Sequence, residues 1–160
     1  MDPAKPDSFN HRTEALSTGR TYHFVDQRPE KYDPAKTPTI LCIHGFPDLW
    51  CAKLACFNGT CIAHHICTPT YLRRYGWRYQ IGPWVRAGYR VLAPDMLGYG
   101  GTDKPATPVS YSIKRLCDDL AALLDVIDVR RAVIAGHDWG SAIAWRFALY
   151  HPERILALVT

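Results

Sequence analysis

The chain has 160 residues, of which 48% are hydrophobic and 21% are charged, with a formal net charge of +4. These values are ordinary for a soluble globular protein, and Lys and Arg are interspersed with Asp and Glu, which argues against a nucleic-acid partner. No run approaches the roughly eighteen apolar residues of a membrane span, and the first residues do not resemble a signal peptide. We therefore expect a cytoplasmic protein with no membrane partner.

Apolar runs and helical periodicity alternate along the chain. The sequence predicts a strand pair near residues 20–26, a strand over residues 39–43, a helix over residues 79–87 and a strand over residues 89–93. A helix is predicted over residues 112–127 because its apolar side chains recur on one face, at Ile113, Leu116, Leu120, Leu123, Leu124 and Ile127. This alternation predicts the α/β class, with a mainly parallel sheet flanked by helices.

The next segment predicts a strand, a tight turn and a helix. Residues 132–135 are apolar, residues 141–149 read as a helix, and Gly136-His137-Asp138-Trp139-Gly140 lies between them. The glycines permit a strained turn that presents a nucleophile, and the helix would direct its free N–H groups at Asp138. A carboxylate in place of a serine hydroxyl indicates attack on a saturated carbon. A simple helix N-cap aspartate is the alternative interpretation.

A second motif lies about ninety residues earlier in the chain. The strand over residues 39–43 runs into His44-Gly45-Phe46-Pro47, where an oxyanion-hole loop would lie in such a fold. The backbone N–H groups of Phe46 and Trp139 would then stabilise a developing oxyanion. Two such motifs, each at its own strand end, form a stronger signal than either alone.

Three ordered segments, residues 44–48, 93–105 and 136–141, closely resemble the soluble epoxide hydrolases of the α/β-hydrolase fold. The resemblance covers residues 19–50 and 75–160. Haloalkane dehalogenases share the aspartate-tryptophan turn and are the rival, although Phe46 stands where those enzymes often place a halide-binding Asn. Trp139 is either a wall of the substrate pocket or an ordinary core aromatic, and we favour the pocket because its neighbour is the nucleophile. We expect Phe46 to line the same pocket.

The resemblance implies a mechanism with a small-molecule epoxide as substrate. Asp138 would form a covalent alkyl ester, and water activated by a histidine would hydrolyse it, with two cap tyrosines protonating the epoxide oxygen and an acid orienting the histidine. No metal or cofactor is expected. After Asp138 the only histidine is His151, which we interpret as a helix-end residue. We expect His137 to pack and His44 to shape its loop, while Asp48 and Asp95 make local turn hydrogen bonds.

Residues 51–74 form an atypical Cys-rich insert without clear periodicity. They contain four of the six cysteines and two histidines: Cys51, Cys56, Cys61, Cys67, His64 and His65. A zinc site is disfavoured because no Cys-x-x-Cys pair is present, and disulfides are disfavoured without a secretory signal. Deleting these residues joins Trp50 to Tyr75 in frame, so we interpret the insert as a translated intron.

The family resemblance implies a longer enzyme, with a cap and further strands after the turn. We therefore expect residues 1–160 to be an incomplete α/β-hydrolase core, ending within a buried strand near residues 155–160, and its exposed edge to promote aggregation. Two hypotheses stay open: an incomplete record of an epoxide hydrolase, or a real but noncatalytic 160-residue product. The oligomeric state is not determined by the sequence.

Overall fold

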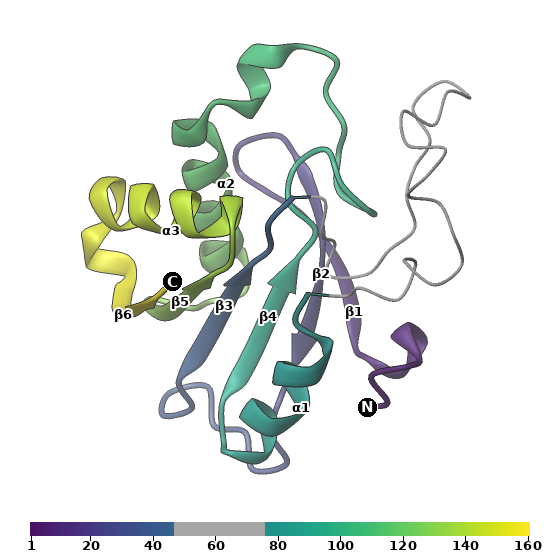
Figure 1. The fold of residues 1–160 in the computed structure, drawn as a ribbon. Coiled ribbons are helices and arrows are strands. Elements are labelled where there is room, and N and C mark those ends of the chain that lie inside the picture. The colour runs from purple at the N-terminus through teal and green to yellow at the C-terminus, as the bar shows by residue number, and fades with distance from the viewer. Residues whose placement is uncertain (47–75) are drawn as a thin grey trace.

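The computed structural model describes residues 1–46 and 76–160. Its centre is a six-stranded sheet with the spatial order β1-β2-β4-β3-β5-β6 (Figure 1). The strands are β1 (His11–Ala15), β2 (Thr21–Gln27), β3 (Thr39–Ile43), β4 (Arg90–Pro94), β5 (Ala132–Gly136) and β6 (Ile155–Val159). The first two strands are antiparallel to their neighbours, whereas β4, β3, β5 and β6 are parallel. The predicted α/β class with a mainly parallel sheet is therefore confirmed.

In the described residues, three α-helices and two short 3-10 helices lie between strands, and a third 3-10 helix precedes the first strand. The α-helices are α1 (Arg78–Arg86), α2 (Ile113–Val126) and α3 (Trp139–Tyr150), and the 3-10 helices are η1 (Pro6–Ser8), η4 (Pro108–Tyr111) and η5 (Pro152–Arg154). Each predicted helix and strand in the described residues is present, with boundaries shifted by a few residues. This agreement follows from strong periodicity, since side chains that recur every 3.6 or two residues place one apolar face against a core.

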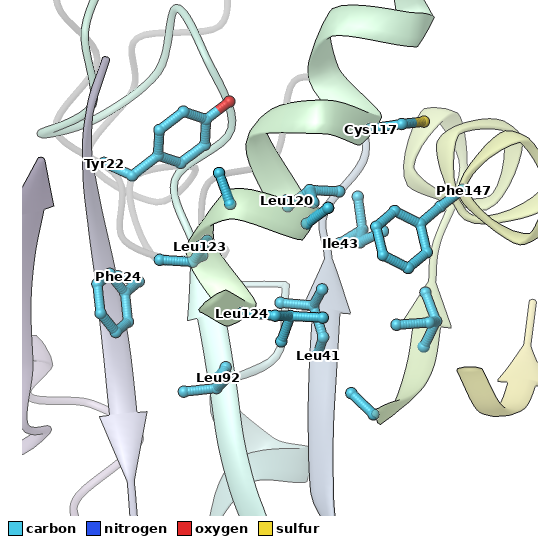
Figure 2. Close-up of a cluster of buried hydrophobic side chains, with 14 of the residues drawn as sticks. Tyr22, Phe24, Leu41, Ile43, Leu92, Cys117, Leu120, Leu123, Leu124 and Phe147 are labelled. Atoms are coloured by element: carbon cyan, nitrogen blue, oxygen red, sulfur yellow. The ribbon is translucent and has the colours of Figure 1, made fainter. Parts of the chain in front are cut away.

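The sheet is covered on both faces because its central strands are apolar on both sides. On one face, α2 and α3 pack over a core that includes Tyr22, Leu41 and Ile43 (Figure 2). On the other face, Ile81 and Val85 of α1 pack against a second core. The predicted apolar face of α2 is confirmed, since its residues are buried in the first core or packed against it.

Strand β6 forms at the predicted place and is the edge strand of the sheet. Its apolar side chains are partly exposed, since Leu156 is 45% exposed and Val159 is 57% exposed. Trp145 and Leu149 of the neighbouring helix α3 are also exposed. The expected exposed edge is therefore confirmed, and burial of this strand in a longer enzyme stays a prediction.

Within residues 1–46 and 76–160, no helix is both long enough and apolar enough to cross a membrane. The Cys-rich insert over residues 51–74 lies outside the described residues, as does Asp48.

Candidate active site

Asp138 lies at the turn between β5 and α3, as the glycine pattern predicted. Its backbone adopts φ 56° and ψ −123°, a strained conformation that non-glycine residues rarely adopt. Such a conformation persists only where the surrounding structure holds it in place. The flanking glycines are required by close contacts: a Cβ on Gly136 would lie 2.6 Å from the carbonyl oxygen of Gly140, and one on Gly140 would lie 2.1 Å from that of Ile43. The turn therefore projects the Asp138 side chain beyond the strand end.

Backbone N–H groups hold the Asp138 carboxylate. The Phe46 N–H donates a hydrogen bond to Asp138 Oδ1 over 2.9 Å, joining the ends of β3 and β5. This hydrogen bond, followed by that from the Trp139 N–H, lowers the pKa of Asp138 below its ordinary value. The two N–H groups that the sequence assigned to an oxyanion hole thus converge on one carboxylate.

The loop after β3 approaches the nucleophile because Gly45 has no side chain. A Cβ on Gly45 would lie 2.5 Å from Asp138 Cβ and 2.7 Å from Asp138 Oδ1. His44 stabilises this loop through two hydrogen bonds. Its Nε2 accepts a hydrogen bond from the Met96 N–H over 3.0 Å. Because a neutral imidazole then carries its proton on the other nitrogen, the Nδ1–H donates to the Gly45 carbonyl oxygen over 2.9 Å. The prediction that His44 shapes its loop is confirmed.

An open cleft of about 310 Å³ lies beside Asp138. Phe46 and Trp139 both line it, and their side chains are 64% and 62% exposed. The other lining side chains are mainly apolar and come from the loop after β4, from η4, and from the starts of α2 and α3: Met96, Leu97, Tyr99, Tyr111, Ile113, Leu116 and Ile143. The cleft can accept an apolar molecule next to a carboxylate.

Sequence reasoning missed Tyr99, which lines this cleft. Its ring lies edge-on to His44, with the ring centroids 5.0 Å apart and the planes at 82°. Burial and the nearby negative charge of Asp138 raise the pKa of Tyr99. The residue lies in the segment 93–105 that was already singled out, but only the fold brings the end of β4 next to the ends of β3 and β5.

Other predicted residues lie away from the Asp138 carboxylate. His151 is at the far end of α3, where its Nε2 lies 3.0 Å from Asp118 Oδ1, as expected for a helix-end residue. Asp95 accepts a hydrogen bond from the Gly101 N–H over 2.8 Å, which confirms its predicted turn role, and it also contacts His23 Nδ1. His137 was expected to pack, but it is exposed and lines a second hollow of about 250 Å³.

Comparison with known proteins agrees with this architecture. The family described as alpha/beta hydrolase fold matches residues 38–160, and the chain belongs to that family. In the part of the chain that the structure describes, no group of His, Cys, Asp and Glu side chains is arranged to hold a metal ion.

Several curated proteins similar to the chain are epoxide hydrolases. It is 39% identical over 122 residues to epoxide hydrolase 3 of Siraitia grosvenorii, covering 76% of this chain and 31% of that protein. It is 31% identical over 158 residues to bifunctional epoxide hydrolase 2 of Rattus norvegicus, covering 99% of this chain and 23% of that protein. Among solved structures, an epoxide hydrolase of Vigna radiata superposes with a TM-score of 0.73 at 31% identity, covering 96% of this chain and 38% of that one. The chain thus spans less than half the length of these relatives.

Proposed function

We propose that Asp138 is the nucleophile of an epoxide-hydrolase reaction. Its carboxylate oxygen attacks a ring carbon of a small-molecule epoxide, the carbon–oxygen bond of the ring breaks, and the ring oxygen takes up a proton. Water then adds to the carboxyl carbon of the resulting ester, which releases the diol and restores Asp138. The observation that carries this proposal is the 2.9 Å hydrogen bond from the Phe46 N–H to Asp138 Oδ1 at a strained turn beside an apolar cleft.

The environment of Asp138 suits both steps. In the first step the carboxylate must be ionised, and hydrogen bonds from the Phe46 and Trp139 N–H groups lower its pKa while Asp138 stays exposed. In the second step negative charge develops on a carboxyl oxygen of Asp138 itself. The same two N–H groups would then serve as an oxyanion hole, worth about 10²–10³ in rate for each donor.

We further propose that residues 1–160 stop at the ester. Hydrolysis of the ester needs a base that activates water, and histidine is the usual one. His151 is bonded to Asp118 at the far end of α3, and both ring nitrogens of His44 are engaged by backbone groups. The exposed His137 lines the second hollow and is not among the residues that line the cleft. The ester on Asp138 should therefore accumulate instead of turning over.

Intact-mass spectrometry of the chain incubated with a phenyl-substituted epoxide tests both proposals. We expect one adduct with the mass of the epoxide, located on Asp138 by peptide mapping, and no steady formation of diol. Asp138→Asn should abolish the adduct. Asp128→Asn is the matched control, because Asp128 is the other described non-glycine residue at φ 56°.

Two outcomes would overturn the assignment. An adduct that persists in Asp138→Asn would place the nucleophile elsewhere. Labelling and halide release with haloalkanes, without any adduct from epoxides, would instead favour the dehalogenase alternative. Steady diol formation would contradict only the proposed stop at the ester. The cytoplasmic location expected from the sequence remains a prediction.

We also propose that residues 51–74 are a translated intron. A Trp codon followed by a Cys codon contains the GT of a splice donor, and an AGG codon for Arg74 would contain the acceptor AG and restore the Trp50 codon. Transcript reads across Trp50 test this: spliced messages that join Trp50 to Tyr75 support it. Uniformly unspliced messages that encode a folded, active protein would contradict it.

A further inference from the structure

A chain of side-chain hydrogen bonds runs from the amino-terminal segment to the end of β4, next to the cleft. The Pro6 carbonyl oxygen lies 3.1 Å from His11 Nε2, and His11 Nδ1 lies 2.9 Å from His23 Nε2. His23 Nδ1 in turn lies 2.8 Å from Asp95 Oδ2. The histidine pair, His11 on β1 and His23 on β2, therefore uses every ring nitrogen in this chain, which ends at a buried carboxylate.

The two ends of this chain determine how many ring protons the histidine pair carries. A carbonyl oxygen and a carboxylate only accept hydrogen bonds, so His11 Nε2 and His23 Nδ1 must both carry protons. The hydrogen bond between the rings needs one further proton, on either of its two nitrogens. The pair thus requires three ring protons, whereas two neutral imidazoles carry two and two imidazolium ions carry four. It bears one positive charge, because an imidazole ordinarily binds a proton more tightly than a carboxylate does.

Asp95 connects this charge to the loop that lines the cleft. Asp95 Oδ2 also accepts a hydrogen bond from the Gly101 N–H over 2.8 Å. A Cβ on Gly101 would lie 2.8 Å from His23 Cβ, so the loop packs directly on this histidine. The residue after Asp95, Met96, lines the cleft and donates its N–H to His44, which holds the loop after β3. The histidine pair therefore supports both loops that meet at Asp138.

Asp95 is the carboxylate that faces the charge of the histidine pair. It is 1% exposed, and its other oxygen, Oδ1, is buried without a hydrogen-bond partner in the described part of the chain. Arg12 of β1 contacts Asp26 of β2, and the Lys104 ammonium is held by carbonyl oxygens of its own loop. The other described charged residues on the elements around the pair are Lys5, Asp7, Glu14 and Asp103, and Glu14 pairs with Arg12.

We propose that His11, His23 and Asp95 form a proton-dependent clamp that positions the loop after β4 at the cleft. This inference rests on the function proposed above, because the loop lines the cleft of that reaction. While the pair holds a third ring proton, all three hydrogen bonds form and the buried carboxylate faces a positive charge. When rising pH removes that proton, one hydrogen bond is lost and Asp95 loses its counter-charge. His23 is thus a positioning residue that acts on Asp138 through the loops.

Counting ring protons by nitrogen-15 NMR tests the clamp without any reaction. At about pH 5.5, below the ordinary histidine pKa of about 6.5, two independent histidines would both be imidazolium ions. We expect the histidine pair to carry three ring protons instead of four, because a fourth would set two N–H groups against each other over 2.9 Å. His151 is the control, since it contacts the Asp118 carboxylate and should carry two ring protons. Either two or four ring protons on the pair would overturn the inference.

The alkylation rate of Asp138 by a phenyl-substituted epoxide tests the positioning role. We expect the wild-type rate to fall about three- to tenfold, the worth of one hydrogen bond, from about pH 5.5 to about pH 8.5. His23→Asn keeps a neutral N–H donor for Asp95 but cannot take up the proton, so its rate should not show this fall. His23→Phe should be slower than His23→Asn at both pH values, because it removes the donor as well.

His151→Gln is the matched control for these variants. It removes the other described histidine that contacts an aspartate, at the far end of α3, and should keep the wild-type pH profile. A wild-type rate that does not fall, or the same fall in His23→Asn, would overturn the positioning role. If the wild-type chain forms no adduct at any pH, the proposed reaction fails, while the count of ring protons still decides whether the clamp exists.

Discussion

Two aspartates, Asp26 within the sheet and Asp138 in the turn after β5, are both held ionised, but by different means. Asp26 on β2 is fully buried, and its carboxylate contacts Arg90 and Arg12 at 2.7 Å. Burial by itself would raise the pKa of Asp26, but hydrogen bonds from these two arginines and the charges of Arg90 and Arg28 lower it. Asp138 is exposed, and hydrogen bonds from backbone N–H groups lower its pKa instead.

This difference separates a structural carboxylate from a reactive one. Arginine side chains neutralise Asp26 and occupy its oxygens, so no electron pair is available to a substrate. Backbone N–H groups stabilise the charge of Asp138 with partial dipoles and leave the residue exposed. A lowered pKa alone does not identify a nucleophile, because the groups that lower it decide whether the carboxylate can react.

The largest effect is expected when the structural carboxylate loses its charge. Asp26→Asn would leave Arg90, which is 2% exposed, with an uncompensated charge. We expect the free energy of unfolding to fall by about 3–5 kcal/mol, measured by urea denaturation. Asp125→Asn is the control, because its carboxylate is 66% exposed and pairs with Arg154 at 2.8 Å, so its loss should cost less than about 1 kcal/mol. Equal losses in the two variants would contradict the distinction.

The next largest effect is expected at the loop that supplies an N–H to Asp138. A Cβ at Gly45 would lie 2.5 Å from Asp138 Cβ and 2.8 Å from the His137 carbonyl oxygen, so Gly45→Ala must displace the loop. We expect alkylation of Asp138 to slow about 100-fold, measured by the rate of adduct formation.

Gly82→Ala in α1 provides the comparison for Gly45→Ala. Its added methyl group would meet only the movable end of Arg86, at 3.3 Å. This variant should keep the wild-type alkylation rate. A wild-type rate in Gly45→Ala would show that the approach of the loop to Asp138 does not matter.

Both aspartates should become half protonated only below their ordinary pKa of 3.8. The stability that Asp26 contributes is fully present above the ordinary pKa of 3.8 and is lost as the pH falls through its lower folded value. The alkylation rate follows the ionised fraction of Asp138, so at pH 3.8 it should still exceed half of its value at neutral pH. The measurement is the rate with a phenylalkyl chloride, alongside the folded fraction from circular dichroism. A rate that halves above pH 3.8 while the chain stays folded would contradict the lowered pKa of Asp138.

The smallest effect is expected at the outer edge of the sheet. Leu156 on β6 is exposed, and an uncovered apolar edge strand favours pairing between chains. Leu156→Lys should shift self-association to a few-fold higher protein concentration, measured by sedimentation. Thr18→Lys adds the same charge at an exposed turn and should change it less. A wild-type chain that is monomeric at all accessible concentrations and unfolds in a two-state manner would contradict the expected self-association.

The sequence alone predicted most features that depend on neighbouring residues, although the expected packing of His137 was wrong. The glycines around Asp138, the strand before it and the helix after it belong to one short segment, so the strained turn was predictable from residue types. The apolar face of α2 was predictable for the same reason, since its spacing is a local property. The position of Phe46 was predictable only through a family resemblance, because it is 92 residues from Asp138.

Tertiary structure alone decided which distant groups meet. No sequence pattern indicated that Arg90 would contact Asp26, which is 64 residues away, or that the Tyr99 ring would pack on His44. It also could not decide whether β6 is covered, because apolar composition predicts burial only where another element is present to pack against it. The physical reason is common to these cases: strand order, not residue type, determines which side chains share one end of the sheet. In this chain that order brings a carboxylate, two N–H groups and a phenol to one cleft.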